Sequence, residues 1–132
     1  MNLKDHSLKT YDAQNGVGGV EIKSFVRVKD RIWAGTPRGD LLIYDPAKDV
    51  WSSLETADPL KKEGLNSIHV LKESVWICRD NGVSVYHLPS GRWETLTTSD
   101  GLLSNIVFFA AEDKDGIWFG TDQGASHLTL NP

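Results

Sequence analysis

Short apolar runs separated by polar, glycine-containing turns follow one another along this chain, and one of these runs occurs three times. Each copy begins with a β-branched residue followed by Trp. The Trp residues are Trp33, Trp76 and Trp118, so successive copies lie 43 and 42 residues apart. Alternation of apolar and polar positions over such short runs predicts half-buried β-strands rather than helices. We therefore expect an all-β protein built from a repeat, with the three Trp side chains buried between sheets.

Each repeat contains four strand-like runs, of which the Trp run is the second. In the middle repeat these runs are residues 68–71, 75–79, 83–86 and 93–96. A period of 40-odd residues with four strands is typical of one blade of a β-propeller. The sequence predicts blades over residues 20–56, 66–98 and 105–130, and the third of these lacks its fourth strand.

The missing strand is expected at the other end of the chain. When the repeats are registered on their turn glycines, residues 8–11 align with residues 93–96, so residues 7–12 complete the third blade. Splitting one blade between the two termini hides the exposed edges of the ring. We therefore treat residues 1–132 as one half-propeller domain.

Closure of the ring requires more than one copy of the chain, because propellers use roughly four to eight blades. A two-fold homodimer that exchanges residues 7–12 gives six blades and uses the commonest closed symmetry. Three copies would exceed the usual number of blades. The alternative is that the chain is a piece of a longer propeller.

Residues 100–124 carry four local motifs: an Asp-Gly-Leu start, Asn105 before the inner strand, an Asp-x-Asp-Gly hairpin and a Trp-x-Gly-Thr core. This stretch resembles the repeat of the two-component regulator propeller family. The resemblance implies a non-catalytic module for ligand or protein recognition, similar to the sensory propellers of two-component regulators. The family's propellers are usually extracellular parts of longer receptors.

Composition and charge argue against two classes of partner, nucleic acids and membranes. The net charge of −4 argues against nucleic acid, which requires a basic surface. No apolar run approaches the ~20 residues of a membrane span, and the first residues lack the apolar region of a signal peptide. With a single cysteine, these features predict a cytoplasmic protein without a membrane partner. Cys78 aligns with Gly35 and Gly120, which predicts a small buried packing residue.

Candidate binding residues lie in the turns after the Trp strands and in the links between blades. Arg38 and Arg79 are expected to capture an anionic ligand or an acidic partner loop, with asparagines orienting it. The alternative is that the Asn and Asp residues only cap turns. The full set of candidates is Arg38, Asn66, Arg79, Asp80, Asn105, Asp122 and Gln123.

No catalytic residue, metal site or cofactor is expected from the motifs. The alternative function is a small propeller lyase or lactonase with a metal-assisted site at the channel mouth, using His69 or His127 with Asp80 or Asp122. His127 stands at an apolar position of its repeat. We expect it to form a hydrogen bond with Tyr11 or Thr10 of the exchanged strand.

Overall fold

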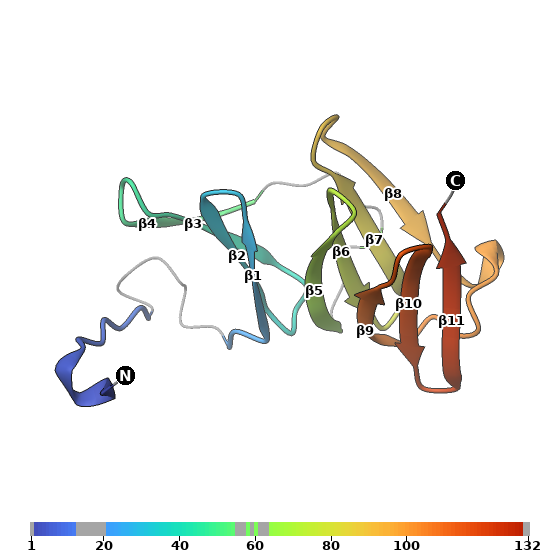
Figure 1. Ribbon diagram of the computed structural model, residues 1–132, viewed down its shortest axis with the longest axis horizontal. Coiled ribbons are helices and arrows are strands. Elements are labelled where there is room, and N and C mark those ends of the chain that lie inside the picture. The colour runs from blue at the N-terminus through green and yellow to red at the C-terminus, as the bar shows by residue number, and fades with distance from the viewer. Residues whose placement is uncertain (1, 13–20, 55–57, 59, 61–63, 131–132) are drawn as a thin grey trace.

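The computed structural model describes residues 2–12, 21–54, 58, 60 and 64–130. Within this part of the chain, eleven strands form three antiparallel sheets that follow one another in space as they do in sequence (Figure 1). The strands are β1 Ser24–Val28, β2 Arg31–Gly35, β3 Leu41–Asp45, β4 Val50–Ser53, β5 Leu65–Leu71, β6 Ser74–Arg79, β7 Gly82–His87, β8 Arg92–Leu96, β9 Val107–Glu112, β10 Gly116–Thr121 and β11 Gly124–Thr129. No helix of the described residues is both long and apolar enough to cross a bilayer.

The order of strands agrees with the repeat. The first sheet is β1-β2-β3-β4, the second is β5-β6-β7-β8, and the third contains β9, β10 and β11 without a fourth strand. Paired positions repeat as well, because Trp33 lies opposite Ile43, Trp76 opposite Val85 and Trp118 opposite His127. The three sheets are therefore equivalent units.

Tight turns join the strands where glycine permits a left-handed backbone. Gly82 has φ +120°, and a Cβ atom there would lie 2.7 Å from the carbonyl oxygen of Leu96. Both the backbone conformation and the close approach of β8 exclude a larger residue. The turn between β6 and β7 is therefore determined locally, and it sets the register of the hairpin.

Apolar side chains fill the spaces between neighbouring sheets. Trp33 and Ile77 belong to the cluster between the first and second sheets, and Trp76 and Phe119 belong to the cluster between the second and third. Trp33 and Trp76 are each 5% exposed, which confirms their expected burial. Cys78 is fully buried, as expected for a packing residue, and burial raises the pKa of its thiol to about 12.

The expected burial of Trp118 is wrong for the single chain, since its side chain is 48% exposed. Trp118 and Gly120 lie on the face of the third sheet that points away from the second. A Cβ atom at Gly35 would lie 2.6 Å from Leu65 of the next sheet, whereas a Cβ atom at Gly120 would meet no atom of the described residues within 4 Å. Within the described chain, no further sheet covers this face.

Residues 7–12 form no strand in the single chain, and they lie at the opposite end of the molecule from β11 (Figure 1). Tyr11 packs on Tyr44 and Trp51 of the first sheet, with ring centroids 5.5 and 5.9 Å apart. The carboxylate of Asp49 accepts hydrogen bonds from Tyr11, Tyr44 and Lys9, and these bonds hold its pKa below the usual range. The N-terminal segment is thus anchored on the first sheet.

Candidate functional site

The turns after the Trp strands lie together on one edge of the three sheets. We call them the turn surface and define it as residues 36–40, 79–82 and 121–124. Hydrogen bonds between consecutive repeats connect these turns. The amide of Gly64 donates to Pro37 O (2.7 Å), and the amide of Gly82 donates to Asn105 O (2.7 Å). The first two turns are therefore each held by the segment that leads into the next sheet, while the amide of Asp122 in the third turn donates to Ile106 O of its own repeat at 3.3 Å.

Two of the expected binding residues contribute to the same connections. The Nδ2 of Asn66 donates to Asp80 Oδ1 (2.9 Å) and to Val107 O (2.8 Å), so it bridges the second and third sheets. The Oδ1 of Asn105 accepts from the amide of Thr98 at 2.8 Å. These side chains position the turns.

Arg79 requires a correction, because it does not lie on the surface. Its side chain is fully buried, and its Nη2 lies 2.9 Å from Asp58 Oδ2. Ser84 donates to the same carboxylate and accepts from Arg79 Nε. Burial lowers the pKa of Arg79, while the charge of Asp58 opposes that effect. A buried arginine needs such a partner, and Asp58 lies in an irregular link whose path the repeat pattern does not predict.

The remaining candidates are exposed. Arg38, Asp80, Asp122 and Gln123 all reach solvent from the turn surface. Ser104 Oγ donates to Asp122 Oδ1 at 2.6 Å and so orients that carboxylate. The turn surface therefore presents an arginine from the first repeat and carboxylates from the second and third.

His69 and His127, which the lyase or lactonase alternative would use, form hydrogen bonds with other residues. The amide of Ala110 donates to His69 Nε2 at 3.2 Å, so this nitrogen is an acceptor at the contact between the second and third sheets. Asp80 and Asp122, the proposed carboxylates, bind Asn66 and Ser104 instead. Among the described residues, no group of three or more His, Cys, Asp or Glu side chains is arranged to hold a metal ion.

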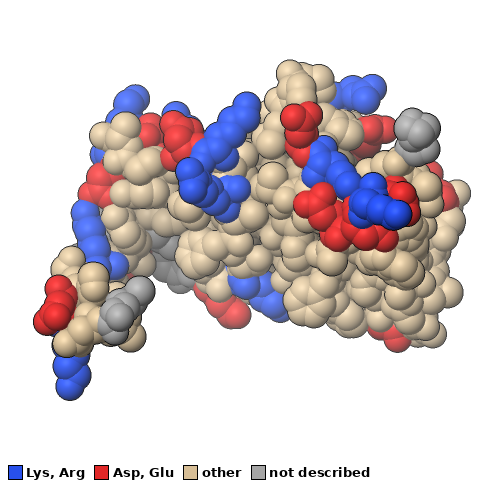
Figure 2. Space-filling model, in the orientation of Figure 1, with Lys and Arg blue, Asp and Glu red and all other residues tan. Residues whose placement is uncertain are grey.

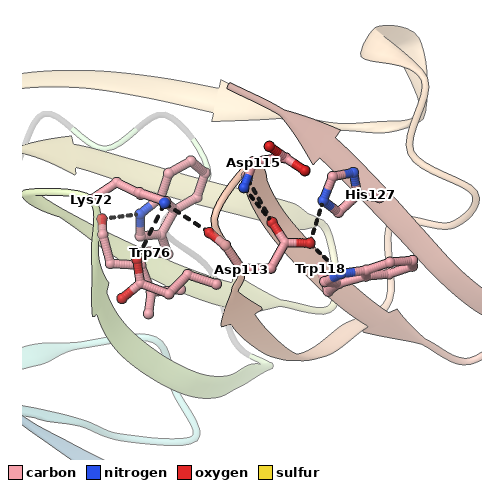
Figure 3. Close-up of polar contacts among 9 residues, drawn as sticks. Lys72, Trp76, Asp113, Asp115, Trp118 and His127 are labelled. Atoms are coloured by element: carbon pink, nitrogen blue, oxygen red, sulfur yellow. Dashed lines mark hydrogen bonds and ion pairs between the residues drawn. The ribbon is translucent and has the colours of Figure 1, made fainter. Parts of the chain in front are cut away.

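His127 contacts Asp113 in the single chain, rather than Tyr11 or Thr10 (Figure 3). Its Nε2 lies 3.1 Å from Asp113 Oδ2, and Trp118 Nε1 donates to the same oxygen at 2.9 Å. Burial alone would raise the pKa of Asp113. Backbone amides of Asp115 and Gly116, together with His127 and Trp118, lower that pKa to about 2.

A cleft of about 350 Å³ lies between the second and third sheets, near the free edge of β11. Lys72 is at its rim, where Nζ donates to Asp113 O at 2.8 Å (Figure 3). The lining residues are Lys72, Ser74, Trp76, Val85, His87, Glu94, Thr95, Leu96, Leu128 and Leu130. The sequence alone did not indicate this cleft, because it depends on how the second and third sheets approach each other.

Charges are interspersed on the face shown in Figure 2. Lysine and arginine side chains alternate with aspartate and glutamate, and the area over β9–β11 is largely uncharged. This distribution offers no extended basic surface on that face.

Residues 101–123 match the family model described as two component regulator propeller. The third repeat is a two-component regulator propeller repeat. These 23 residues are the stretch in which the sequence motifs of the family were found, so the resemblance is confirmed there. No curated protein matches the chain.

Solved structures show the same fold. The extracellular domain of the putative hybrid two component system BT3049 from B. thetaiotaomicron is 17% identical, with a TM-score of 0.75; the match covers 92% of this chain and 19% of that one. For BT4673 of the same organism the identity is 23%, the TM-score 0.73 and the coverage 84% and 15%. A streptogramin B lyase, 15% identical, has a TM-score of 0.54 and coverage of 84% and 41%. The chain spans less than a fifth of the length of the first two.

The expectation of a cytoplasmic location is contradicted by these comparisons, because the similar propellers from B. thetaiotaomicron are extracellular domains. The earlier inference used the first residues and the single cysteine. The first residues and the cysteine count do not indicate the compartment, because this chain matches only a small part of longer chains. A propeller also derives its stability from packing between blades, so disulfides are not required outside the cell.

Proposed function

We propose that this chain is a non-catalytic recognition module of an extracellular sensory β-propeller, and that it binds a ligand or a partner protein through the turn surface. The similar propellers from B. thetaiotaomicron belong to putative signalling systems. The repeat at residues 101–123 is of the two-component regulator type. We infer from these similarities that this chain also serves in a sensory propeller.

The observation that carries the proposal is the arrangement of the three turns. Hydrogen bonds from Gly64 to Pro37 and from Gly82 to Asn105 fix the backbone, while Arg38, Asp80 and Asp122 stay exposed. A turn whose backbone is already fixed loses little backbone freedom when it binds a partner. Loops held by such a scaffold are the usual location of binding residues. The turns differ in sequence although the frame repeats, which suits recognition of one particular pattern of charge.

We do not extend the proposal to catalysis. A metal-assisted lyase or lactonase would need His69 or His127 close to Asp80 or Asp122, and all four of these side chains form other hydrogen bonds. The likeness to streptogramin B lyase, at 15% identity, concerns the fold alone.

A binding screen tests the proposal. The purified chain is screened by thermal shift against charged small molecules and peptides, and the affinity of each hit is then measured by calorimetry. We expect Arg38→Ala or Asp80→Asn to weaken a hit about tenfold, which is the loss of one charged hydrogen bond. Arg92→Ala is the matched control, because this arginine is equally exposed but lies on β8. Hits that bind all variants equally would exclude the turn surface.

A further inference from the structure

We propose that the cleft beside β11 and the open face of the third sheet bind a second copy of this chain, whose residues 7–11 pair with β11 and whose Leu8 fills the cleft. The inference does not depend on the proposed function. It follows from comparison of the contact between the second and third sheets with the equivalent contact between the first and second.

Between the first and second sheets, the space equivalent to the cleft is filled by Trp93 of the fourth strand, β8. Trp93 lies 4.9 Å from the ring of Tyr86, measured between centroids, and packs against the apolar cluster that contains Trp33. The other apolar residues around that cluster include Ile43, Leu54 and Leu88. The indole of a fourth-strand residue thus closes the outer part of this contact.

The walls of the cleft are the same positions one repeat later. Trp76 corresponds to Trp33 and Val85 corresponds to Ile43. Trp76 lies opposite Val85 in the second sheet, as Trp33 lies opposite Ile43 in the first. Leu96, Leu128 and Leu130 follow at the positions of Leu54, Tyr86 and Leu88. The residue that would correspond to Trp93 belongs to the fourth strand, which the third sheet lacks. The cleft therefore lies where a side chain equivalent to Trp93 would pack if the third sheet had a fourth strand.

Leu8 meets the requirement for that position. In the second sheet Tyr86 lies opposite Trp93. The same register places Leu8 opposite Leu128, because residues 8–11 align with residues 93–96. Leu8 is 99% exposed in the single chain, so its burial in an apolar cleft is favourable. Within one chain, the N-terminal segment and β11 lie at opposite ends of the molecule, so a Leu8 that fills the cleft comes from another copy (Figure 1).

The open face of the third sheet fits the first sheet of that second copy. Trp33 packs on Tyr86 of the next sheet, with ring centroids 5.6 Å apart. Tyr44 occupies the position of Tyr86 in the first sheet, as its pairing with Trp51 shows. Trp118 would therefore pack on Tyr44 of the second copy. Burial of Trp118 in this way would repeat the contact that Trp33 makes with Tyr86.

The N-terminal segment already lies where this arrangement needs it. Leu96 of the fourth strand in the second sheet packs beside Leu128 of the following sheet. Tyr11, which aligns with Leu96, packs on Tyr44, which aligns with Leu128. The N-terminal segment thus packs against the first sheet of its own chain in the way that the fourth strand of one blade packs against the next blade. The β11 edge of the second copy then adds beside it, and two such contacts close a ring of six blades.

Covalent trapping tests the proposed pairing. The register of His87 with Arg92 predicts that Ser7 lies opposite Thr129 of the other copy. Ser7→Cys with Thr129→Cys should give a disulfide-linked dimer on a non-reducing gel, because cross-strand pairs fall within disulfide distance. The natural Cys78 is fully buried and should not react. Ser7→Cys with Ser99→Cys is the mismatched control, since Ser99 is exposed but lies outside the pairing region.

Light scattering of the unmodified chain at micromolar concentration should give about twice the 14.6 kDa chain mass. Leu8→Asp should shift the mass to that of one chain, whereas Leu3→Asp, which changes an exposed leucine outside the strand, should not. A monomeric unmodified chain, a ring of three or more copies, or a dimer that survives Leu8→Asp would each overturn the proposal. Equal disulfide trapping of the matched and mismatched pairs would also overturn it.

Discussion

The indole of Trp33 packs against the ring of Tyr86 in the next sheet, with ring centroids 5.6 Å apart. This contact joins one repeat to the next, and its geometry depends on residues 53 positions apart in sequence. Trp118 has the equivalent place in the third repeat, but its side chain is 48% exposed. The same residue in the same strand position is therefore buried or exposed according to the presence of a following sheet.

The Trp residues of the repeat are expected to differ in their contribution to stability. Trp76→Ala should lower the free energy of unfolding by about 3–5 kcal/mol, as is usual when a large buried aromatic residue is removed. Trp118→Ala should cost less in the monomer, because half of its side chain already contacts water. Urea denaturation at low protein concentration measures both. Equal losses in the monomer would show that Trp118 is buried.

Two equivalent glycines provide a matched comparison of overpacking. Gly35→Ala should destabilise the chain by roughly 1–3 kcal/mol, because the added methyl group would lie 2.6 Å from Leu65 Cδ2. Gly120→Ala should have a small effect on the stability of the monomer, since the described residues leave its Cβ position open. Thermal or urea denaturation of the two variants distinguishes them. A large loss for Gly120→Ala in the monomer would contradict the open face.

The two arginines of the turn surface should also behave differently. Arg79→Ala breaks the buried ion pair with Asp58, which should cost on the order of 3–5 kcal/mol of stability. Arg38→Ala changes an exposed residue and should stay within about 0.5 kcal/mol of the unmodified chain. Chemical denaturation monitored by tryptophan fluorescence gives both values. A harmless Arg79→Ala would contradict the buried ion pair.

Acid should weaken the contact between the second and third sheets through His69. Burial lowers the pKa of His69 below its usual value of 6.5, so the unfolded chain takes up this proton at a higher pH than the folded chain does. The contribution of neutral His69 is therefore complete above about pH 6.5 and declines as the pH falls below it. Protonation would also remove the acceptor for the amide of Ala110.

His69→Gln provides the control for that pH dependence, because an amide oxygen can accept the same hydrogen bond and does not titrate. The stability of the unmodified chain should fall more steeply than that of His69→Gln between about pH 6.5 and 5. The measurement is urea denaturation at a series of pH values. Parallel curves would show that His69 does not contribute.

Much of the fold could be predicted because the repeat is visible at the level of single residues. Trp33 and Trp76 mark equivalent strands, and the glycine-containing turns that follow them mark the hairpins. The expected run at residues 93–96 corresponds to β8, Arg92–Leu96. Strand pattern and turn chemistry are local properties, so they can be recognised without knowledge of the neighbours.

The candidate site was harder to predict, because exposure depends on contacts between distant segments. Arg79 was expected at the surface with Arg38, because both follow a Trp strand closely, yet it is buried against Asp58, which lies 21 residues earlier in an irregular link. Asn66 is expected from the sequence to orient a bound ligand, but its bonds to Asp80 and Val107 depend on how two sheets approach each other. The spacing of residues in the sequence predicts neither the partner of Arg79 nor the partners of Asn66.

The sequence by itself determined the repeat and the positions of most strands, since these depend on periodicity and turn residues. Only the tertiary structure decided which face of each sheet is covered, where Tyr11 lies and that a cleft remains beside β11. The physical reason is that one blade cannot bury its apolar faces alone. Burial in a propeller is a property of the contact between blades. Trp118, whose sheet has no following sheet among the described residues, is therefore exposed, whereas the equivalent Trp33 and Trp76 are buried.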